Sequence, residues 1–403
     1  MKKAMIVTVG TGSDVENGIR FSIVQNNPSL VFFVCSMDSL GKVKAVKQLL
    51  KESPPRYRQE MLDEVNDVEV IYGRLSAVVD SLTTMGFAPH QITADYTSGT
   101  KSMSAALVSV AIARELGALS YVHGDRDANG RVRSGTERLI PLRPNAIFSR
   151  ERLKTFCRLF DRYRFDAAIS VLEGSSTHPS MESENRVFLQ LAKCYSTWDR
   201  FDFKTAVDMM ASIDLKELSR IERFKPLSAA LSQQKQFIFR IDERNRRREY
   251  SELDVIDLFS NALRRKEEGR YDDCVSRLYR LVEMVGQIEF QKAFRMSTSR
   301  ADLAKLPEHV VSAMGFKDRK GVVELPLFKT YSGLSVVKGS SIAKAFHDNR
   351  ERFREYLLVR NNSRLAHGLK PIGRKVCEEF VELVREVFKV EDEVRFVRLS
   401  EMF

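Results

Sequence analysis

Hydrophobic and polar positions change their spacing along this chain. Over residues 1–145, short apolar runs alternate with segments in which apolar residues recur every three or four positions. Short apolar runs are typical of buried strands, and the longer periodic segments are typical of amphipathic helices. The predicted strands are Ala4–Val9, Leu30–Cys35, Val68–Tyr72, Gln91–Tyr96 and Leu119–His123, with an edge strand at Arg138–Leu142. This alternation predicts a Rossmann-like α/β domain whose parallel sheet binds ligands at the carboxyl ends of its strands.

From residue 146 onward the pattern is helical. Helices are expected at about residues 251–268, 272–292, 342–367 and 375–388, and residues 394–399 are expected to form a short terminal strand. An arginine-rich run at residues 244–248 lies between helical segments and marks the last boundary. We therefore predict an α/β domain at residues 1–145, a helical connecting region at 146–249 and an all-α domain at 250–403.

Charge and cysteine content narrow the class of protein. The chain of 403 residues has 65 Lys and Arg against 54 Asp and Glu, a formal net charge of +11, which favours an anionic partner such as nucleic acid. Its five cysteines are scattered singly, as in proteins of a reducing cytosol, and neither they nor the six histidines have the spacing of a metal site. Gly10 interrupts the first apolar run too early for a signal peptide, and no run is long enough to span a membrane. We expect a cytoplasmic protein with no membrane partner.

Two loops that follow predicted strands are suited to phosphate. Gly10, Thr11, Gly12 and Ser13 follow the first strand, and Ser98, Gly99, Thr100, Lys101 and Ser102 follow the fourth. Backbone N–H groups, hydroxyls and a lysine at the start of a helix favour a bound phosphate. Neither loop is a standard nucleotide motif, because Val15 replaces a third glycine and Ala94 replaces the first glycine of a P-loop. The alternative is a pair of ordinary strand-to-helix turns.

A second candidate site lies near the C-terminus. Arg360 and His367 are seven residues apart, so on one continuous helix they would share a face, with Arg364 between them. A guanidinium can hold a phosphate and an imidazole can move a proton near neutral pH, which together suit phosphodiester chemistry. The alternative is an amphipathic helix with a solvated arginine. The residues expected to form its packing face are Leu357, Leu358, Leu365 and Ala366.

Both sites resemble those of one known family. The segment from Arg360 to His367, with Asn361 after the arginine, resembles the Arg-x(4–6)-His motif of HEPN ribonucleases. The loops at residues 10–13 and 97–103 resemble the ligand loops of CARF domains, the CRISPR-associated Rossmann fold. A CARF domain followed by a C-terminal HEPN domain is the layout of the ancillary ribonucleases of type III CRISPR systems. The resemblance covers roughly residues 1–145 and 250–390 and leaves the helical middle unassigned.

The resemblance implies an endoribonuclease that cleaves single-stranded RNA without a metal and is activated by cyclic oligoadenylate, its only small-molecule requirement. Two CARF domains would bind the ring across a homodimer, and two HEPN motifs would form one site in which the ribose 2′-OH attacks the phosphorus and leaves a 2′,3′-cyclic phosphate. His367 would be the general acid/base, Arg360 would hold the phosphate, and Asn361 would orient either group. Substrate contacts are expected from Ser363 and Arg364, and further ring contacts from Ser36 and Met37.

Two other kinds of function remain open from the sequence. The first is a non-catalytic regulator that senses a nucleotide and binds nucleic acid or protein, and a cleavage assay separates it from the ribonuclease. The second is an enzyme that acts at the strand ends of the α/β domain, for example by degrading its own messenger. In that case Lys101→Ala would remove all turnover, whereas in the ribonuclease it would remove only activation.

Overall fold

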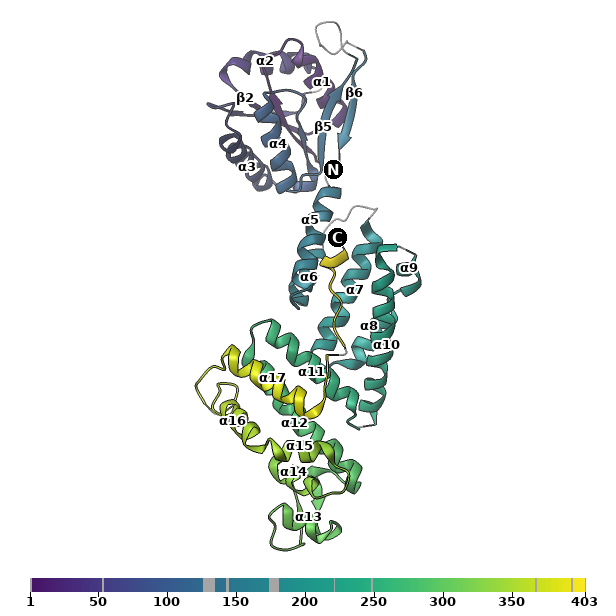
Figure 1. Ribbon diagram of the computed structural model, residues 1–403. Helices are drawn as coiled ribbons and strands as arrows, with labels where there is room; N and C mark the ends of the chain where they lie inside the picture. The colour runs from purple at the N-terminus through teal and green to yellow at the C-terminus, as the bar shows by residue number, and fades with distance from the viewer. Residues whose placement is uncertain are drawn as a thin grey trace. The chain divides into compact units, whose positions relative to one another are not determined.

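The computed structural model describes residues 2–52, 54–125, 135–142, 145–173, 181–220, 222–247, 249–366, 368–392 and 394–402. The chain divides into two compact units: the first contains the residues up to Leu153, with residues 181–183 grouped with it, and the second contains the other residues from Lys154 onward. Figure 1 labels the helices and strands of both units. The predicted boundaries at residues 145 and 249 stay predictions.

The first unit is a six-stranded sheet with helices on both faces (Figure 1). The strands are β1 (Ala4–Val9), β2 (Leu30–Cys35), β3 (Arg56–Met61), β4 (Ile92–Asp95), β5 (Ala118–His123) and β6 (Arg138–Leu142). Their order is β3-β2-β1-β4-β5-β6, and every neighbouring pair is parallel except β5 with β6. This order confirms the predicted Rossmann-like fold and places the reversal of strand order between β1 and β4.

Four helices cover the sheet. They are α1 (Val15–Asn26), α2 (Leu40–Leu49), α3 (Val68–Thr84) and α4 (Lys101–Ala113). Alternate residues of β1 divide between two cores: Met5 and Val7 pack with α1 and α2, whereas Ala4 and Ile6 pack with α3 and α4. Because both faces of the central strands are buried, β1 and β2 are continuous apolar runs, which is why the sequence pattern located them.

One predicted strand is wrong. Residues 68–72 begin helix α3, because the Asp67 side chain caps it by accepting hydrogen bonds from the backbone N–H groups of Glu69 (2.9 Å) and Val70 (3.1 Å). The third strand is instead β3, whose side chains are largely polar and solvent-accessible. An edge strand pairs on one side only and carries charged residues there, so it lacks the apolar pattern of a buried strand.

The second unit is helical. The first helices are α5 (Asn145–Phe160), whose last residues belong to this unit, α6 (Phe165–Leu172), α7 (Glu182–Asp199), α8 (Phe203–Ala211), α9 (Leu215–Ser219) and α10 (Lys225–Arg246). The later helices are α11 (Glu252–Glu267), α12 (Tyr271–Phe294), α13 (Glu308–Ala313), α14 (Leu327–Ser335), α15 (Ser341–Asp348), α16 (Arg350–Asn361) and α17 (Arg374–Phe388), with a small sheet of β7 (Ala301–Asp302) and β8 (Val322–Val323). Helix α12 is central to the later group, since it packs against α11, α14, α16 and α17.

The predicted terminal strand at residues 394–399 is also wrong. Residues 394–402, which we call the C-terminal strap, run beside helices α6 and α7 (Figure 1, yellow). The strap is extended up to Leu399 and ends in a 3₁₀ turn at Ser400–Met402. No strand pairs with the strap among the described residues, because side chains take its backbone groups instead: Asp161 accepts from the N–H of Leu399 (2.7 Å), and the Tyr195 hydroxyl accepts from that of Val397 (3.3 Å). The Phe396 ring stacks on Tyr195 with 4.0 Å between centroids, so the strap forms part of the core.

Candidate functional site

The two phosphate-suited loops meet at the carboxyl ends of β1 and β4. The Gly10 N–H donates a hydrogen bond to the Ser98 hydroxyl at 2.9 Å. A Cβ atom at Gly10 would lie 2.9 Å from the Gly99 nitrogen, so the two backbones are in direct contact and only glycine fits at position 10. Gly99 has a φ of +108°, which favours glycine as well. The structure therefore joins the two loops into one surface at the place where ligands bind in this fold.

A buried polar network supports this surface from below. The Thr8 hydroxyl donates to the backbone oxygens of Asp95 (3.4 Å) and Ser98, which ties the end of β1 to the second loop. The Asp95 carboxylate accepts from the Thr97 N–H at 3.0 Å and from the Ser22 hydroxyl. Burial raises the pKa of Asp95, and these hydrogen bonds oppose that rise. The sequence analysis missed Thr8 and Asp95, although an aspartate that ends a buried apolar run is a usable signal.

The second loop leads into helix α4. The Thr100 hydroxyl caps this helix by accepting from the Met103 N–H (3.1 Å), and it donates to the Val65 oxygen (2.7 Å). Lys101 is the first residue of α4 and is exposed, and Ser102 beside it is half-buried. A cation at a helix N-terminus adds to the positive end of the helix dipole, so this position attracts an anion.

The remaining predicted ring contacts lie at the same edge of the sheet. Thr11, Gly12 and Ser13 are exposed between β1 and α1. Ser36 and Met37 directly follow β2, whose last residue is in register with the last residue of β1. The Ser36 N–H donates to the Ser39 hydroxyl (3.0 Å), whereas the Met37 side chain is 74% exposed. Met37 is therefore available for contact with a ligand above the sheet.

In the helical unit, Arg360 lies in the last turn of α16 and is held against α12. Its guanidinium carbon is 4.3 Å from the centroid of the Tyr279 ring, a stacking that fixes the plane of the side chain. Its Nη1 donates to the Asn361 side-chain oxygen at 3.1 Å, and its Nε is buried with no acceptor among the described residues. Burial raises the pKa of Tyr279, and Glu283 beside it adds to the rise, so the ring stays neutral beneath the cation.

The predicted continuous helix through this motif is wrong. Helix α16 ends at Asn361, after which Asn362 and Ser363 begin a turn. Asparagine and serine side chains compete for backbone hydrogen bonds, so a run of them disfavours helix. The Ala366 and Gly368 N–H groups both donate to the Ser363 oxygen, at 3.1 and 3.0 Å. The helix that carries Arg360 therefore ends before position 367, and His367 itself lies outside the described residues.

Ser363 and Arg364 have different environments in this turn. Ser363 is buried, whereas Arg364 is exposed and its Nε donates to the Leu369 oxygen at 3.3 Å. Of the predicted packing residues, Leu357 is buried, but Leu358 and Leu365 are 60% and 57% exposed, and Ala366 is intermediate. Leu357 therefore packs as expected, whereas Leu358 and Leu365 belong to the surface.

Two family models match the chain. The model described as the Csm6 6H domain matches residues 148–238, and the model described as the Csm6 HEPN domain matches residues 243–391. Together they cover more than half of the sequence and place Arg360 inside the HEPN match. The chain belongs to the Csm6 family. This family comprises CARF–HEPN ancillary ribonucleases of type III CRISPR systems, so the predicted family and the ribonuclease class are confirmed.

A solved structure of a Csm6 protein agrees with this fold. A structure titled as Csm6 of Enterococcus italicus bound to cyclic hexa-2′-fluoro-hexa-dAMP is 14% identical, with a TM-score of 0.62 over 96% of this chain and 94% of that one. Can2 of Sulfobacillus thermosulfidooxidans, in complex with cyclic tetra-adenylate, is 10% identical over 52% of this chain and 68% of that one, with a TM-score of 0.26. No curated protein matches the sequence.

Membership of the Csm6 family assigns the helical middle of the chain, which the sequence resemblance left unassigned. Residues 148–238 correspond to the 6H domain, whereas residues 392–403 lie beyond both family matches. In the described part of the chain, no cluster of three or more His, Cys, Asp or Glu side chains could hold a metal ion. No helix among those residues is long and apolar enough to cross a membrane.

Proposed function

We propose that the chain is an endoribonuclease that cleaves single-stranded RNA at Arg360 and His367 and is activated when cyclic oligoadenylate binds the loops at β1 and β4. The observation that carries the proposal is the junction of Gly10 with Ser98 and Gly99, which forms one phosphate-suited surface at the reversal of strand order. The HEPN match around Arg360 supplies the second half of the proposal.

The chemistry of Arg360 and His367 explains cleavage without a metal. Arg360 is stacked on Tyr279, so its guanidinium is oriented before the substrate arrives and can stabilise the charge that develops on the phosphorane oxygens. A base takes the proton of the 2′-OH as that oxygen bonds to phosphorus, and an acid protonates the 5′-oxygen as its bond to phosphorus breaks. His367 supplies this proton transfer, and Asn361 orients Arg360 through their hydrogen bond.

The need for both an acid and a base favours a homodimer. One copy of the motif contains a single histidine, whereas two facing copies supply one imidazole for each proton transfer. Three exposed leucines flank the motif: Leu358, Leu365 and Leu369. Leu369 is 80% exposed. Apolar side chains clustered at one place favour burial against a second protein surface. The cyclic activator favours the same arrangement, because a symmetric ring suits two equal loops.

The activator is recognised through its phosphates and sugars. The exposed Lys101 and the N-terminus of α4 provide positive charge, and Thr11, Ser13 and Ser102 provide hydroxyls. The E. italicus structure, similar in fold, was obtained with a cyclic hexa-adenylate analogue, which supports a ring of this chemical class for the present chain. The buried Asp95 positions the loop through Thr97 rather than contacting the ring.

The proposal is tested by incubating the purified chain with a fluorogenic RNA and cyclic tri-, tetra- or hexa-adenylate, with and without EDTA. We expect one ring to activate cleavage, EDTA to leave the rate unchanged, and the products to end in 2′,3′-cyclic phosphate. A chain that cuts RNA in no condition is not the proposed enzyme. Cleavage that EDTA abolishes would contradict the mechanism but not the activation.

Replacing Gly10 with alanine should separate activation from chemistry. The added methyl group would lie 2.9 Å from the Gly99 nitrogen, so the two loops must move apart. We expect the cyclic oligoadenylate concentration for half-maximal activation to rise at least about tenfold, the equivalent of one charge-assisted hydrogen bond. Cleavage at saturating activator should change little.

The matched control for this variant is Gly41→Ala. Gly41 lies in α2, and a Cβ atom there meets nothing within 4 Å. We expect this variant to be activated like the wild type. Equal half-activation by Gly10→Ala and Gly41→Ala would show that the ring binds elsewhere.

A further inference from the structure

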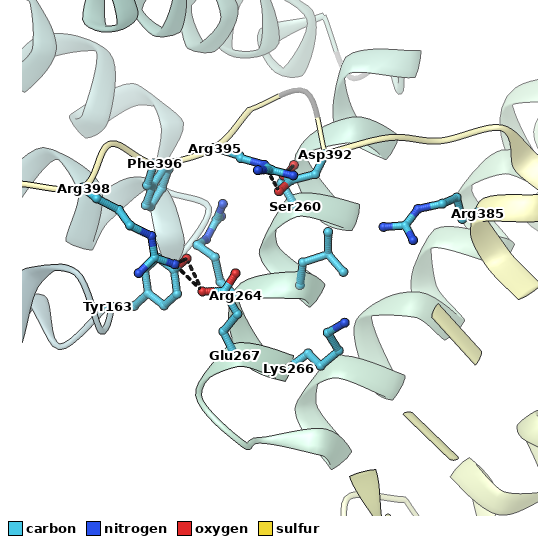
Figure 2. A pocket seen from close by; sticks show the side chains of 11 residues that line it. Tyr163, Ser260, Arg264, Lys266, Glu267, Arg385, Asp392, Arg395, Phe396 and Arg398 are labelled. Atoms are coloured by element: carbon cyan, nitrogen blue, oxygen red, sulfur yellow. Dashed lines mark hydrogen bonds and ion pairs between the residues drawn. The ribbon is translucent and has the colours of Figure 1, made fainter. Parts of the chain in front are cut away.

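The helical unit contains a cavity of about 260 Å³ that is separate from the Arg360 motif (Figure 2). Its walls come from helix α11, helix α17, Asp392 and the C-terminal strap. Tyr163, which lies between α5 and α6, completes the lining. Its charged lining consists of Arg264, Lys266, Glu267, Arg385, Asp392, Arg395 and Arg398. Five of these side chains are basic and two are acidic, and carboxylates outside the lining pair with Arg264 and Arg385.

The acidic side chains engage only two of these cations. Arg398 pairs with Glu267 at 2.6 Å, and Arg395 pairs with Asp392 at 2.9 Å. Figure 2 shows these two pairs at different sides of the cavity, with Lys266 and Arg385 apart from both. Of the other three cations, Arg264 pairs with Asp199 at 2.8 Å, and Arg385 pairs with Glu382 at 2.6 Å and Glu391 at 3.6 Å. The charge that remains unpaired among the described residues belongs to Lys266.

Arg264 and Lys266 have donors for which no described residue supplies an acceptor. Arg264 is 4% exposed; its Nε donates to Asp199, but its Nη2 is buried with no acceptor in the described part of the chain. The Nε of Arg385 makes no hydrogen bond there, although it lies 3.6 Å from the Glu391 carboxylate. Lys266 has no hydrogen-bond or ion-pair partner among the described residues. Buried donors without acceptors are unfavourable, and a bound anion would correct this.

We propose that this cavity binds a small phosphate-bearing anion. Two guanidinium groups and an ammonium group at different sides suit the several oxygens of a phosphate better than the two coplanar oxygens of a carboxylate. The volume is below the range of about 300–1,000 Å³ typical of pockets for drug-sized ligands, so the ligand is no larger than a pyrophosphate or a mononucleotide. An RNA strand does not fit.

The position of the cavity gives the bound anion a structural consequence. Arg264 and Lys266 belong to α11 and Arg385 belongs to α17, so one phosphate would link two helices of the helical unit. A ligand that binds only the folded state stabilises it in proportion to the logarithm of its concentration. The anion should therefore raise the unfolding temperature of this unit, whether or not the proposed ribonuclease activity is correct.

Calorimetric titration of the full chain with inorganic pyrophosphate, and separately with adenosine 5′-monophosphate, tests the proposal. The variant is Lys266→Gln, because Lys266 has no protein partner to lose, and the control is Lys235→Gln, an exposed lysine on α10. We expect Lys266→Gln to bind at least one probe about tenfold more weakly than Lys235→Gln, the loss expected for one charged hydrogen bond. Tighter binding of adenosine 5′-monophosphate than of pyrophosphate would show that a nucleoside is recognised together with the phosphate.

The comparison of the two variants excludes binding elsewhere. The loops at β1 and β4 also suit phosphate, but both variants leave them unchanged, so only the difference between Lys266→Gln and Lys235→Gln reports on the cavity. Circular dichroism and the unfolding temperature without ligand confirm that both variants fold. Equal affinities of the two variants for both probes, or binding of neither probe by the wild type, would overturn the proposal.

Discussion

Replacing Arg360 with alanine should slow RNA cleavage by about 10²- to 10³-fold, the usual loss when a donor to the transition state is removed. The guanidinium is stacked on Tyr279 and hydrogen-bonded to Asn361, so its orientation is fixed and its loss cannot be replaced by water. Binding of cyclic oligoadenylate should persist, because the loops at β1 and β4 are unaltered. Single-turnover cleavage at saturating activator measures the first effect, and calorimetry measures the second.

Arg364→Ala is the matched control for this experiment. Arg364 is exposed, and among the described residues its side chain donates a hydrogen bond only to the Leu369 oxygen, at 3.3 Å, so we expect less than a tenfold loss. Tyr279→Leu should cost an intermediate amount because Arg360 loses its stacking partner, whereas Tyr279→Phe keeps the ring and most of the rate. Full activity of Arg360→Ala would contradict the assignment of the HEPN motif.

The sequence predicted the parts of the fold that are apolar because they are buried on both sides. Strands β1 and β2 lie at the middle of the sheet and were found with their observed bounds, as was the order of the α/β and helical parts. Strand β3 was missed because it lies at the edge and is mostly polar. The strap was misassigned because its buried apolar residues Val394, Phe396 and Leu399 pack against helices far away along the chain rather than in a sheet.

The candidate sites were predictable only as far as local sequence determines them. Gly10 and Ser98 were predicted separately, and the pairing of β1 with β4 brings them within hydrogen-bonding distance. Tyr279 lies on α12, and nothing in the sequence indicated that it would stack on Arg360 from α16. The end of α16 at Asn361 was missed because the seven-residue spacing assumed an unbroken helix, although Asn361, Asn362 and Ser363 disfavour one.

Asp199→Ala should lower the free energy of unfolding of the helical unit by about 3–5 kcal/mol, the usual cost of breaking a buried ion pair. Asp199 is 9% exposed at the end of α7, and its carboxylate accepts from Arg264 at 2.8 Å and from Arg265 at 2.6 Å. Both arginines belong to α11 and are themselves buried, so the alanine variant leaves two buried cations without this partner. The pair joins the 6H match to the HEPN match.

Trp198 reports on this interface directly. It is the chain's one tryptophan, it neighbours Asp199, and its indole N–H donates to Asp257 at 2.7 Å. Urea unfolding followed by tryptophan fluorescence should therefore show a lower midpoint for Asp199→Ala, and Asp199→Asn should recover part of the loss because its amide oxygen still accepts one hydrogen bond. The exposed Asp208→Ala on α8 is the control and should change stability by less than about 0.5 kcal/mol. If Asp199→Ala unfolds at the same urea concentration as Asp208→Ala, the buried ion pair does not hold α7 against α11.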